Sequence, residues 1–342
     1  MESSQQTTPP RLAGPFSGGG QDSYRRIVAA LVSGDRGMFG LLFLLLAMVA
    51  FFAATAPNFF TLQNFLIIGG LVAATGVMAI AQTFLIISGG IDLSVGGAVA
   101  LTSVLIGALV GDGMSVWIAA LIGLLVGPAI GLINGLFSVK LQMNPLIVTL
   151  GTMSLFTGLA YILSDGATTV IASDSFSYIG SGRPLGIPFP LIIFAVVFVI
   201  GYLVQRFTVV SQAIYAIGGN RRAAQLSGIR VDAIPMGLYI ISGLSASLAA
   251  VILTSQLAAG APTIGESFML SVITAVILGG ASLHGGRGTV LGTLIAVCIL
   301  GVLQGGLSLQ GQSQFIQEMA LGIVLLFAVS IDQTVGRRRV GA

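Results

Sequence analysis

Charged residues are scarce in this chain. Of its 342 residues, 7% are Asp, Glu, Lys or Arg and 55% are hydrophobic. The mean hydropathy is +1.03. A soluble globular domain carries about 25% charged residues, so this composition indicates an all-α polytopic membrane protein. The 48 glycines have no Gly-X-Y period, and they favour close helix packing and broken helices, which are common in transporters.

Several kinds of chemistry lack the residues they need. The only cysteine, Cys298, lies in an apolar run, which excludes an intrachain disulfide and a cysteine metal cluster. His284 is the only histidine, and no catalytic dyad or metal-ligand cluster is visible. No Gly-x-x-x-x-Gly-Lys-Ser/Thr loop occurs, so the chain is not expected to hydrolyse nucleotide by itself. We therefore expect no metal or cofactor in this chain and no enzymatic activity.

Long apolar runs are abundant. Because a helical span needs roughly 20 apolar residues, we predict about ten transmembrane helices, over residues 38–54, 67–88, 93–110, 116–138, 146–163, 189–204, 233–254, 268–281, 289–307 and 315–331. The sixth run, residues 189–204, is shorter than a full span requires. The eighth is short enough to be a broken or half-spanning helix.

The basic residues fix the predicted orientation. With ten spans and the N-terminus inside, 13 of the 14 basic residues fall on cytoplasmic segments and Arg183 alone falls outside. The positive-inside rule predicts this asymmetry, so the net charge of +3 reflects membrane topology and lipid contact, and not nucleic-acid binding. We predict a disordered cytoplasmic tail at 1–36, a transmembrane domain at 37–335 and a basic cytoplasmic tail at 336–342.

Two similar glycine-pair motifs follow apolar runs. The first comprises Gly89, Gly90, Asp92, Leu93, Ser94 and Gly96, and the second Gly279, Gly280, Ser282, Gly285 and Gly286. Asp92 aligns with Ser282, and both residue types are preferred helix N-caps. A buried charge is costly in a membrane, so Asp92 is expected to lie at a helix end, in a wet cavity or against a partner group. Two glycine breaks followed by capped helices could be the whole explanation, and a parallel internal repeat is the alternative.

The longest predicted cytoplasmic loop, 205–232, contains a short helix. Gly218, Gly219 and Asn220 form a turn or N-cap, Arg221 to Leu226 favour a helix, and Ser227-Gly228 ends it. Its alanines, Ala223 and Ala224, would let another protein approach closely. The longest external loop, 164–188, is large enough to cap the outer mouth or to meet a partner.

Polar residues within the predicted spans could bind a neutral polyhydroxyl solute. The candidates for a translocation path are Gln82, Thr83, Asn144, Thr149 and Thr152. Each is also a common helix-packing residue. Glu318 should face the bundle interior or lie near the outer interface. Because the spans hold few carboxylates, an ion-coupled secondary carrier is the weaker alternative.

Four ordered motifs carry a family resemblance. Residues 89–97, 144–152, 218–229 and 279–288 resemble the permease subunits of ribose- and other monosaccharide-type ABC importers, in the branched-chain amino acid/sugar permease family. The resemblance covers about residues 38–335. It implies a type II-like arrangement of ten helices, similar to cobalamin importers, in a bacterial plasma membrane.

The resemblance also implies partners and a coupling region. A second permease copy, in a homo- or heterodimer, would work with cytoplasmic ATPases that bind ATP and Mg²⁺ and with an extracytoplasmic sugar-binding protein. The coupling region would include Gly218, Gly219, Asn220, Ala223, Ala224, Ser227, Gly228 and Ile229. Met269-Leu270-Ser271 and Gly305-Gly306-Leu307 depart from the family's usual pattern. They leave the sugar open among ribose-, xylose- and galactose-like compounds.

Overall fold

The computed structural model describes the backbone over residues 35–265 and 267–340, and the side chains over 38–265 and 267–330. Most of the predicted tail at 1–36 therefore lies outside the described residues. The first half contains α2 (Asp35–Thr55), α3 (Leu62–Ile87), α4 (Val95–Gly111), α5 (Val116–Gly135), the π-helical turn η1 (Leu136–Lys140), α6 (Pro145–Ser164), β1 (Thr169–Val170), α7 (Asp174–Ser181) and η2 (Pro184–Gly186).

The second half begins with two helices on either side of Thr208. It contains α8 (Phe189–Phe207), α9 (Val209–Gly219), α10 (Arg221–Leu226), α11 (Ala233–Leu257), β2 (Ala259–Gly260), η3 (Pro262–Gly265), α12 (Phe268–Leu278), α13 (Val290–Leu309) and α14 (Gln314–Val340). The last of these continues through most of the predicted basic tail.

Each of the ten predicted spans coincides with a helix. Seven helices are long and apolar enough to cross a membrane: α2, α3, α5 with η1, α6, α8, α11 and α13. α4, α12 and the described apolar part of α14 are shorter. α12 has 11 residues, about 16 Å of helix, so the eighth predicted span is a short helix; that it is broken or half-spanning stays a prediction.

Two elements within predicted loops are additional helices. α9 occupies the first half of loop 205–232, and α7 lies in loop 164–188. A small antiparallel ribbon, in which Thr169 pairs with Gly260, joins β1 to β2. The fold is thus helical as predicted, with two short strands added.

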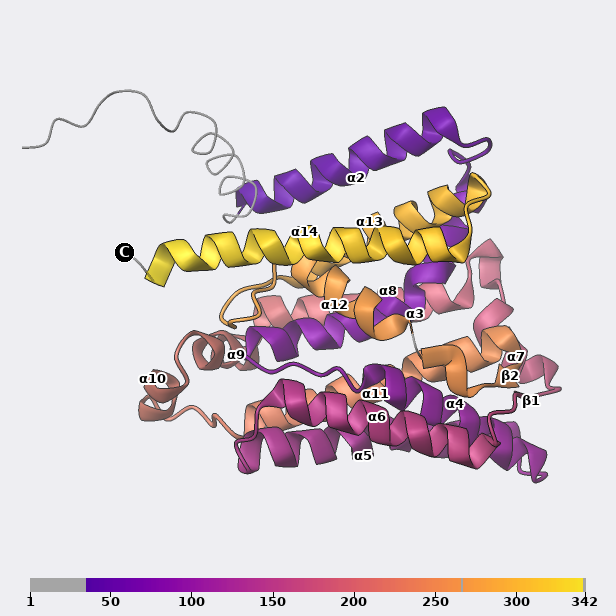
Figure 1. Cartoon of the computed structure of the whole chain (residues 1–342), viewed down its shortest axis with the longest axis horizontal. Coiled ribbons are helices and arrows are strands. Elements are labelled where there is room, and N and C mark those ends of the chain that lie inside the picture. The colour runs from indigo at the N-terminus through magenta and orange to yellow at the C-terminus, as the bar shows by residue number, and fades with distance from the viewer. Residues whose placement is uncertain (1–34, 266, 341–342) are drawn as a thin grey trace, which may run out of the picture.

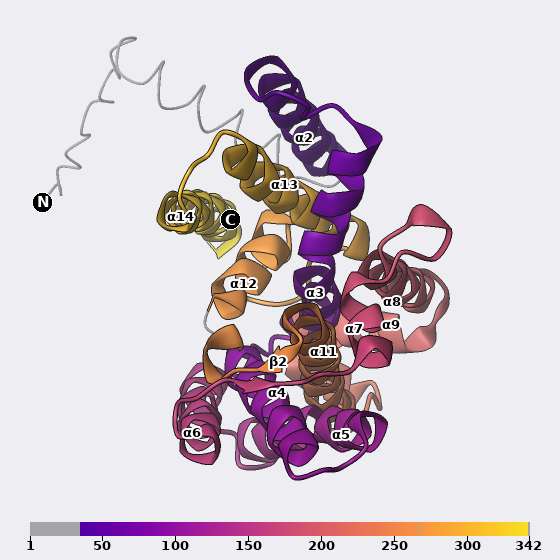
Figure 2. The same ribbon diagram turned by 90° about the vertical axis from the view of Figure 1, so that its right-hand side faces the viewer.

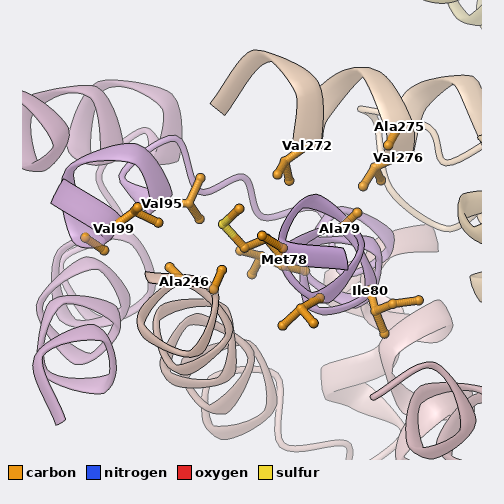
Figure 3. Close-up of a cluster of buried hydrophobic side chains, with 14 of the residues drawn as sticks. Met78, Ala79, Ile80, Val95, Val99, Ala246, Val272, Ala275 and Val276 are labelled. Atoms are coloured by element: carbon orange, nitrogen blue, oxygen red, sulfur yellow. The ribbon is translucent and has the colours of Figure 1, made fainter. Parts of the chain in front are cut away.

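α3 and α11 form the centre of the bundle. α4 and α5 pack against α11 on one side, with α6 packed against α4, and α2, α12, α13 and α14 gather on the other side of α3 (Figure 2). Met78 and Ala79 of α3 are surrounded by side chains from α4, α11 and α12 (Figure 3). Small core residues permit this close packing, because shape fit and not burial from water drives helix association in lipid.

Glycines bring α5 and α11 together. A Cβ at Gly127 would overlap the carbonyl oxygen of Gly243, and a Cβ at Gly131 would overlap that of Tyr239. Residues four apart lie on the same face of a helix, so Gly127, Gly131 and Gly135 make one smooth stripe along α5. This is the close helix packing that the glycine content predicts.

The bundle has two distinct ends, here called the α10 end and the α7 end (Figure 1). The described basic side chains on segments at the α10 end are Lys140, Arg206, Arg221, Arg222, Arg230 and Arg287. Ion pairs and hydrogen bonds between these segments confirm that they meet there. Arg183 precedes η2, on the segment at the α7 end. The predicted segregation of basic residues is therefore present in the fold.

Candidate functional site: a buried polar network and a glycine junction

Asp92 lies in the link between α3 and α4, with 1% of its surface exposed. Its Oδ1 accepts hydrogen bonds from the backbone N–H of Ser94 at 2.9 Å and from the Ser94 hydroxyl at 2.6 Å. Its Oδ2 accepts a hydrogen bond from the hydroxyl of Ser242 on α11 at 2.8 Å. Asn134 of α5 donates to Ser94 Oγ at 2.7 Å and to Asp92 Oδ1 at 3.4 Å.

The same set of contacts reaches two more helices. Thr152 of α6 donates to Asn134 Oδ1 at 2.7 Å. Gln82 of α3 donates to the Asp92 carbonyl at 3.2 Å and accepts from Ser242 at 3.3 Å. We define the Asp92 network as Gln82, Asp92, Ser94, Asn134, Thr152 and Ser242. All six are buried.

Hydrogen bonds, and not a cation, surround this carboxylate. The two ion pairs in the described part of the chain both involve Asp232, which Arg221 approaches to 2.7 Å and Lys140 to 3.6 Å. A charged or polar group inside an apolar bundle must have such partners, since leaving it unpaired costs about 1–3 kcal/mol or more. The Asp92 network therefore holds the α3–α4 link against α5, α6 and α11.

The prediction that Asp92 and Ser282 are N-caps is wrong. The residue before α4 is Ser94, and the cap of α13 is Thr289. Asp92 and Ser282 instead close the same local turn, in which each side chain accepts the backbone N–H two residues later, from Ser94 at 2.9 Å and from His284 at 3.3 Å. Asp and Ser both favour this kind of turn. The left-handed glycine that ends the preceding helix lies three residues before Asp92, at Gly89, and two residues before Ser282, at Gly280, so the two turns are similar but shifted by one residue.

The glycine pairs end α3 and α12 in the same way. Gly89 and Gly280 adopt left-handed φ values of 87° and 90°. The N–H of the following residue then reaches back to a carbonyl five residues earlier, Leu85 in α3 and Val276 in α12. This is the Schellman helix ending, which glycine permits because it has no Cβ. The predicted glycine breaks are confirmed.

Three separate glycine segments meet at the α10 end. Gly286 donates its N–H to the Ile87 carbonyl at 2.8 Å. A Cβ at Gly218 would overlap that carbonyl, and a Cβ at Gly285 would lie 3.2 Å from the Cα of Gly89. We define the glycine junction as the contact among these residues and Gly219. It joins the ends of α3 and α9 to the α12–α13 link, backbone against backbone.

Tyr215 of α9 reinforces the glycine junction. Its hydroxyl donates to the carbonyl of Gly288. Gln205 of α8 donates to Tyr215 at 2.9 Å and accepts the N–H of Val290 at 2.9 Å. Burial raises the pKa of the Tyr215 hydroxyl above its ordinary value, so it remains a neutral donor. α8, α9 and the start of α13 are thereby joined.

The short helix predicted at Arg221 to Leu226 is confirmed as α10. Asn220 caps it by accepting the N–H of Ala223 at 3.0 Å, and Gly228 turns the chain with a φ of 80°. Ala223 is exposed but Ala224 is 4% exposed and packs with Ile217 and Val231. The predicted alanine face is therefore split, since Ala224 anchors α10 to the bundle.

The predicted path residues do not gather in one place. Gln82 and Thr152 belong to the Asp92 network, whereas Thr83 bonds to a threonine of α13 at 2.7 Å. Thr149 donates to a carbonyl of its own helix. Asn144 caps α6, because its side-chain oxygen accepts the backbone N–H of Leu146 at 3.0 Å. Their lining of a path stays a prediction.

Sequence reasoning missed Asn134 and Ser242. Both sit in long apolar runs, where a single amide or hydroxyl was a usable signal. In the residues that the structure describes, no group of three His, Cys, Asp or Glu side chains could hold a metal ion.

Comparison of the sequence with known proteins identifies a family. Residues 64–329 match the permease component of the branched-chain amino acid transport system. The chain belongs to this family. The matched range includes the Asp92 network, the glycine junction and α10.

Individual relatives match almost end to end. The chain is 42% identical over 315 residues to the ribose import permease protein RbsC of Bacillus subtilis, covering 92% of this chain and 97% of the relative. It is 38% identical over 292 residues to RbsC of Escherichia coli K12, covering 84% and 91%. It is 36% identical over 296 residues to the L-arabinose ABC transporter permease protein AraH of Azospirillum brasilense, covering 86% and 87%. No solved structure matches the chain.

These similarities and the fold agree. The relatives are bacterial permeases, and seven helices are long and apolar enough to span a bilayer. The permease is a multi-pass protein of the bacterial plasma membrane.

Proposed function

We propose that this chain is the membrane-spanning subunit of an ATP-driven importer, and that it provides the translocation path for a monosaccharide. The substrate class is supported by the near full-length match to ribose and arabinose permeases. A ribose-, xylose- or galactose-like sugar would be delivered by an extracytoplasmic binding protein. A second permease copy would complete the path, in a type II-like arrangement of ten membrane segments per subunit.

α10 is the proposed docking point for the ATPase. It is a short helix at one end of the bundle, with Leu226 84% exposed and with the exposed cations Arg221 and Arg222 at its start. Asn220 and Gly228 define its two ends, and the glycine junction connects its neighbour α9 to α3. A partner that moved α10 would move packed backbone, which suits the transmission of a domain closure. ATP and Mg²⁺ would be bound by that partner.

The α10 end is the proposed cytoplasmic side. Six described basic side chains lie on segments there, and Arg183 is the described basic residue at the other end. An excess of Lys and Arg on short cytoplasmic loops is the strongest general orientation signal in membrane proteins. Because α2 is the first and α14 the last of an even number of membrane segments, both termini would lie on the same, cytoplasmic side.

Uptake into proteoliposomes tests this proposal. The permease is reconstituted with a candidate partner ATPase and binding protein from the same organism, and entry of radiolabelled ribose, xylose and galactose is followed with internal or external ATP. We expect uptake of one of these sugars that requires ATP and binding protein and is unaffected by ionophores. Uptake abolished by ionophores and independent of ATP would instead identify a secondary carrier.

A further inference from the structure

A polar cavity that is open to the surface, with five of its seven lining residues exposed, lies between the start of α12 and the first turns of α14. Its volume is about 480 Å³, and it is lined by Thr263, Ser267, Leu270, Ser271, Gln314, Glu318 and Leu321. Ligand cavities in proteins typically measure roughly 300–1,000 Å³. None of the lining residues belongs to the Asp92 network or to the predicted path residues. α12 and α14 lie side by side in both views (Figures 1 and 2).

The backbone around the cavity is interrupted where a full span would continue. α12 covers only about half of a ~30 Å hydrocarbon core, and the four-residue 3-10 helix η3 precedes it. η3 packs on α4, where a Cβ at Gly96 would come within 2.9 Å of the Gly265 carbonyl oxygen. Backbone that departs from the regular α-helical pattern at membrane depth is tolerated where it is buried in protein or lines a water-filled cavity. Here one side of η3 is buried against α4, and Thr263 on η3 faces the cavity.

The lining chemistry is that of a polyol site. Three hydroxyls, one carboxamide and one carboxylate surround two leucines. Hydroxyls and amides both donate and accept, and the Glu318 carboxylate can accept from two adjacent sugar hydroxyls. The leucines offer an apolar surface for the C–H face of a sugar ring. Among the side chains that the structure describes, no basic group lines the cavity, so the Glu318 carboxylate would repel anions.

From this cavity we infer that the permease binds a neutral polyhydroxyl solute between α12 and α14, with Glu318 as the selecting group, and that it rejects sugar phosphates and sugar acids. The inference rests on the proposed function and names a contact site within it. Placing the site beside a half-length helix also explains why the eighth segment is short, because broken helices are where transporters expose polar groups to their substrates.

Cysteine labelling tests the cavity without requiring transport. Ser267→Cys is made in a Cys298→Ala background, and Thr274→Cys, fully buried on the same helix, is the control. In the complete complex in nanodiscs, we expect a cationic methanethiosulfonate to label Ser267→Cys about tenfold faster than the control, and faster than an anionic reagent. Adding Glu318→Gln should remove the preference for the cationic reagent. Equal, slow labelling at both positions would overturn the inference.

Protection by solute identifies the ligand class. We expect ribose, xylose or galactose at high concentration to slow labelling of Ser267→Cys several-fold, while equal osmolality of glycine betaine or a sugar phosphate does not. Protection in a complex that shows no ATP-driven uptake would retain the site and overturn the proposed function. Uptake with no protection by any sugar would retain the importer and overturn the site.

Uptake by a matched pair of variants gives a second readout. In the reconstituted importer, Glu318→Gln should lower sugar uptake about tenfold and leave ATP hydrolysis stimulated by loaded binding protein. The adjacent Gln317→Ala, outside the cavity, should transport like the unaltered permease. Wild-type uptake by Glu318→Gln would contradict the assigned role of this carboxylate.

Discussion

Asp92 is a carboxylate inside an apolar bundle, and four donors surround it, two from Ser94 and one each from Asn134 and Ser242. Such a cluster fixes side chains from several helices at once. Because Asn134 lies on α5 and Ser242 on α11, loss of the Asp92 carboxylate would affect α5 and α11 as well as the α3–α4 link. The Asp92 network is therefore expected to specify how α4 sits in the bundle.

Substitutions at Asp92 separate a network from a simple turn. Asn has the same shape, and Ser242 can rotate its hydroxyl to accept from the new amide, so Asp92→Asn should keep transport with a small loss of stability. Asp92→Leu strands several buried donors at about 1–3 kcal/mol each and should not yield folded permease. Asp92→Ser is too short to reach Ser242 and should fall between them. Thermal unfolding in detergent and sugar uptake measure both effects.

The exposed Asp112 provides the control for this series. It lies at the other end of α4, and Asp112→Asn should change stability by no more than about 0.5 kcal/mol. Loss of transport in folded Asp92→Asn would show that charge is required and that hydrogen bonding is not enough.

The fate of single residues shows why sequence alone fell short here. Asp92 and Ser282 were recognisable as special because glycines flank them, and their turn role was within reach. Their partners were not, since Asn134 and Ser242 are 42 and 150 residues away from Asp92. Only tertiary packing places such residues together.

At the scale of elements, the glycine junction gives the sharpest comparison. A Cβ at Gly218 would overlap the Ile87 carbonyl, whereas a Cβ at the adjacent Gly219 meets nothing within 4 Å. We expect Gly218→Ala to lower ATP-driven uptake about tenfold, a loss of ~1.4 kcal/mol in effective coupling, and Gly219→Ala to change it less than twofold or so. ATP hydrolysis by the assembled complex is measured alongside uptake.

The interpretation of the Gly218→Ala and Gly219→Ala results depends on whether each variant still assembles with the ATPase. If the Gly218→Ala permease still binds the ATPase and hydrolysis continues without uptake, the junction transmits motion. Equal uptake by both variants would show that the junction is passive.

Docking by α10 predicts a different phenotype. Leu226→Glu places a charge on an 84% exposed side chain, so the permease should fold with unchanged thermal stability but fail to co-purify with its ATPase. Leu185→Glu, at a fully exposed leucine before α8, is the matched control at the α7 end. Retained ATPase binding by Leu226→Glu would rule out α10 as the docking point.

Elements were predicted well where their signals are local. α10 has a cap, a run of helix formers and a glycine stop within nine residues, and the long apolar runs needed only length. α9 was missed because its apolar face contacts α3, α8 and α11, which no local pattern reveals. The cavity beside α12 was equally hidden, since η3, α12 and α14 form it together.

At the scale of the whole molecule, orientation is directly testable. In a Cys298→Ala background, Ser227→Cys after α10 and Ser175→Cys in α7 report on opposite ends of the bundle. In intact cells we expect a membrane-impermeant maleimide to label Ser175→Cys and to reach Ser227→Cys only after permeabilisation. The reverse pattern would place α10 outside and remove the basis for ATPase docking there.

The measurement that tests the central claim most directly is sugar-stimulated ATP hydrolysis by the complete complex in liposomes, across a panel of pentoses and hexoses with the binding protein present. The account predicts that the permease retains its ATPase through purification and that one neutral monosaccharide raises hydrolysis several-fold. A permease that associates with no ATPase, or hydrolysis that no sugar changes, would contradict it.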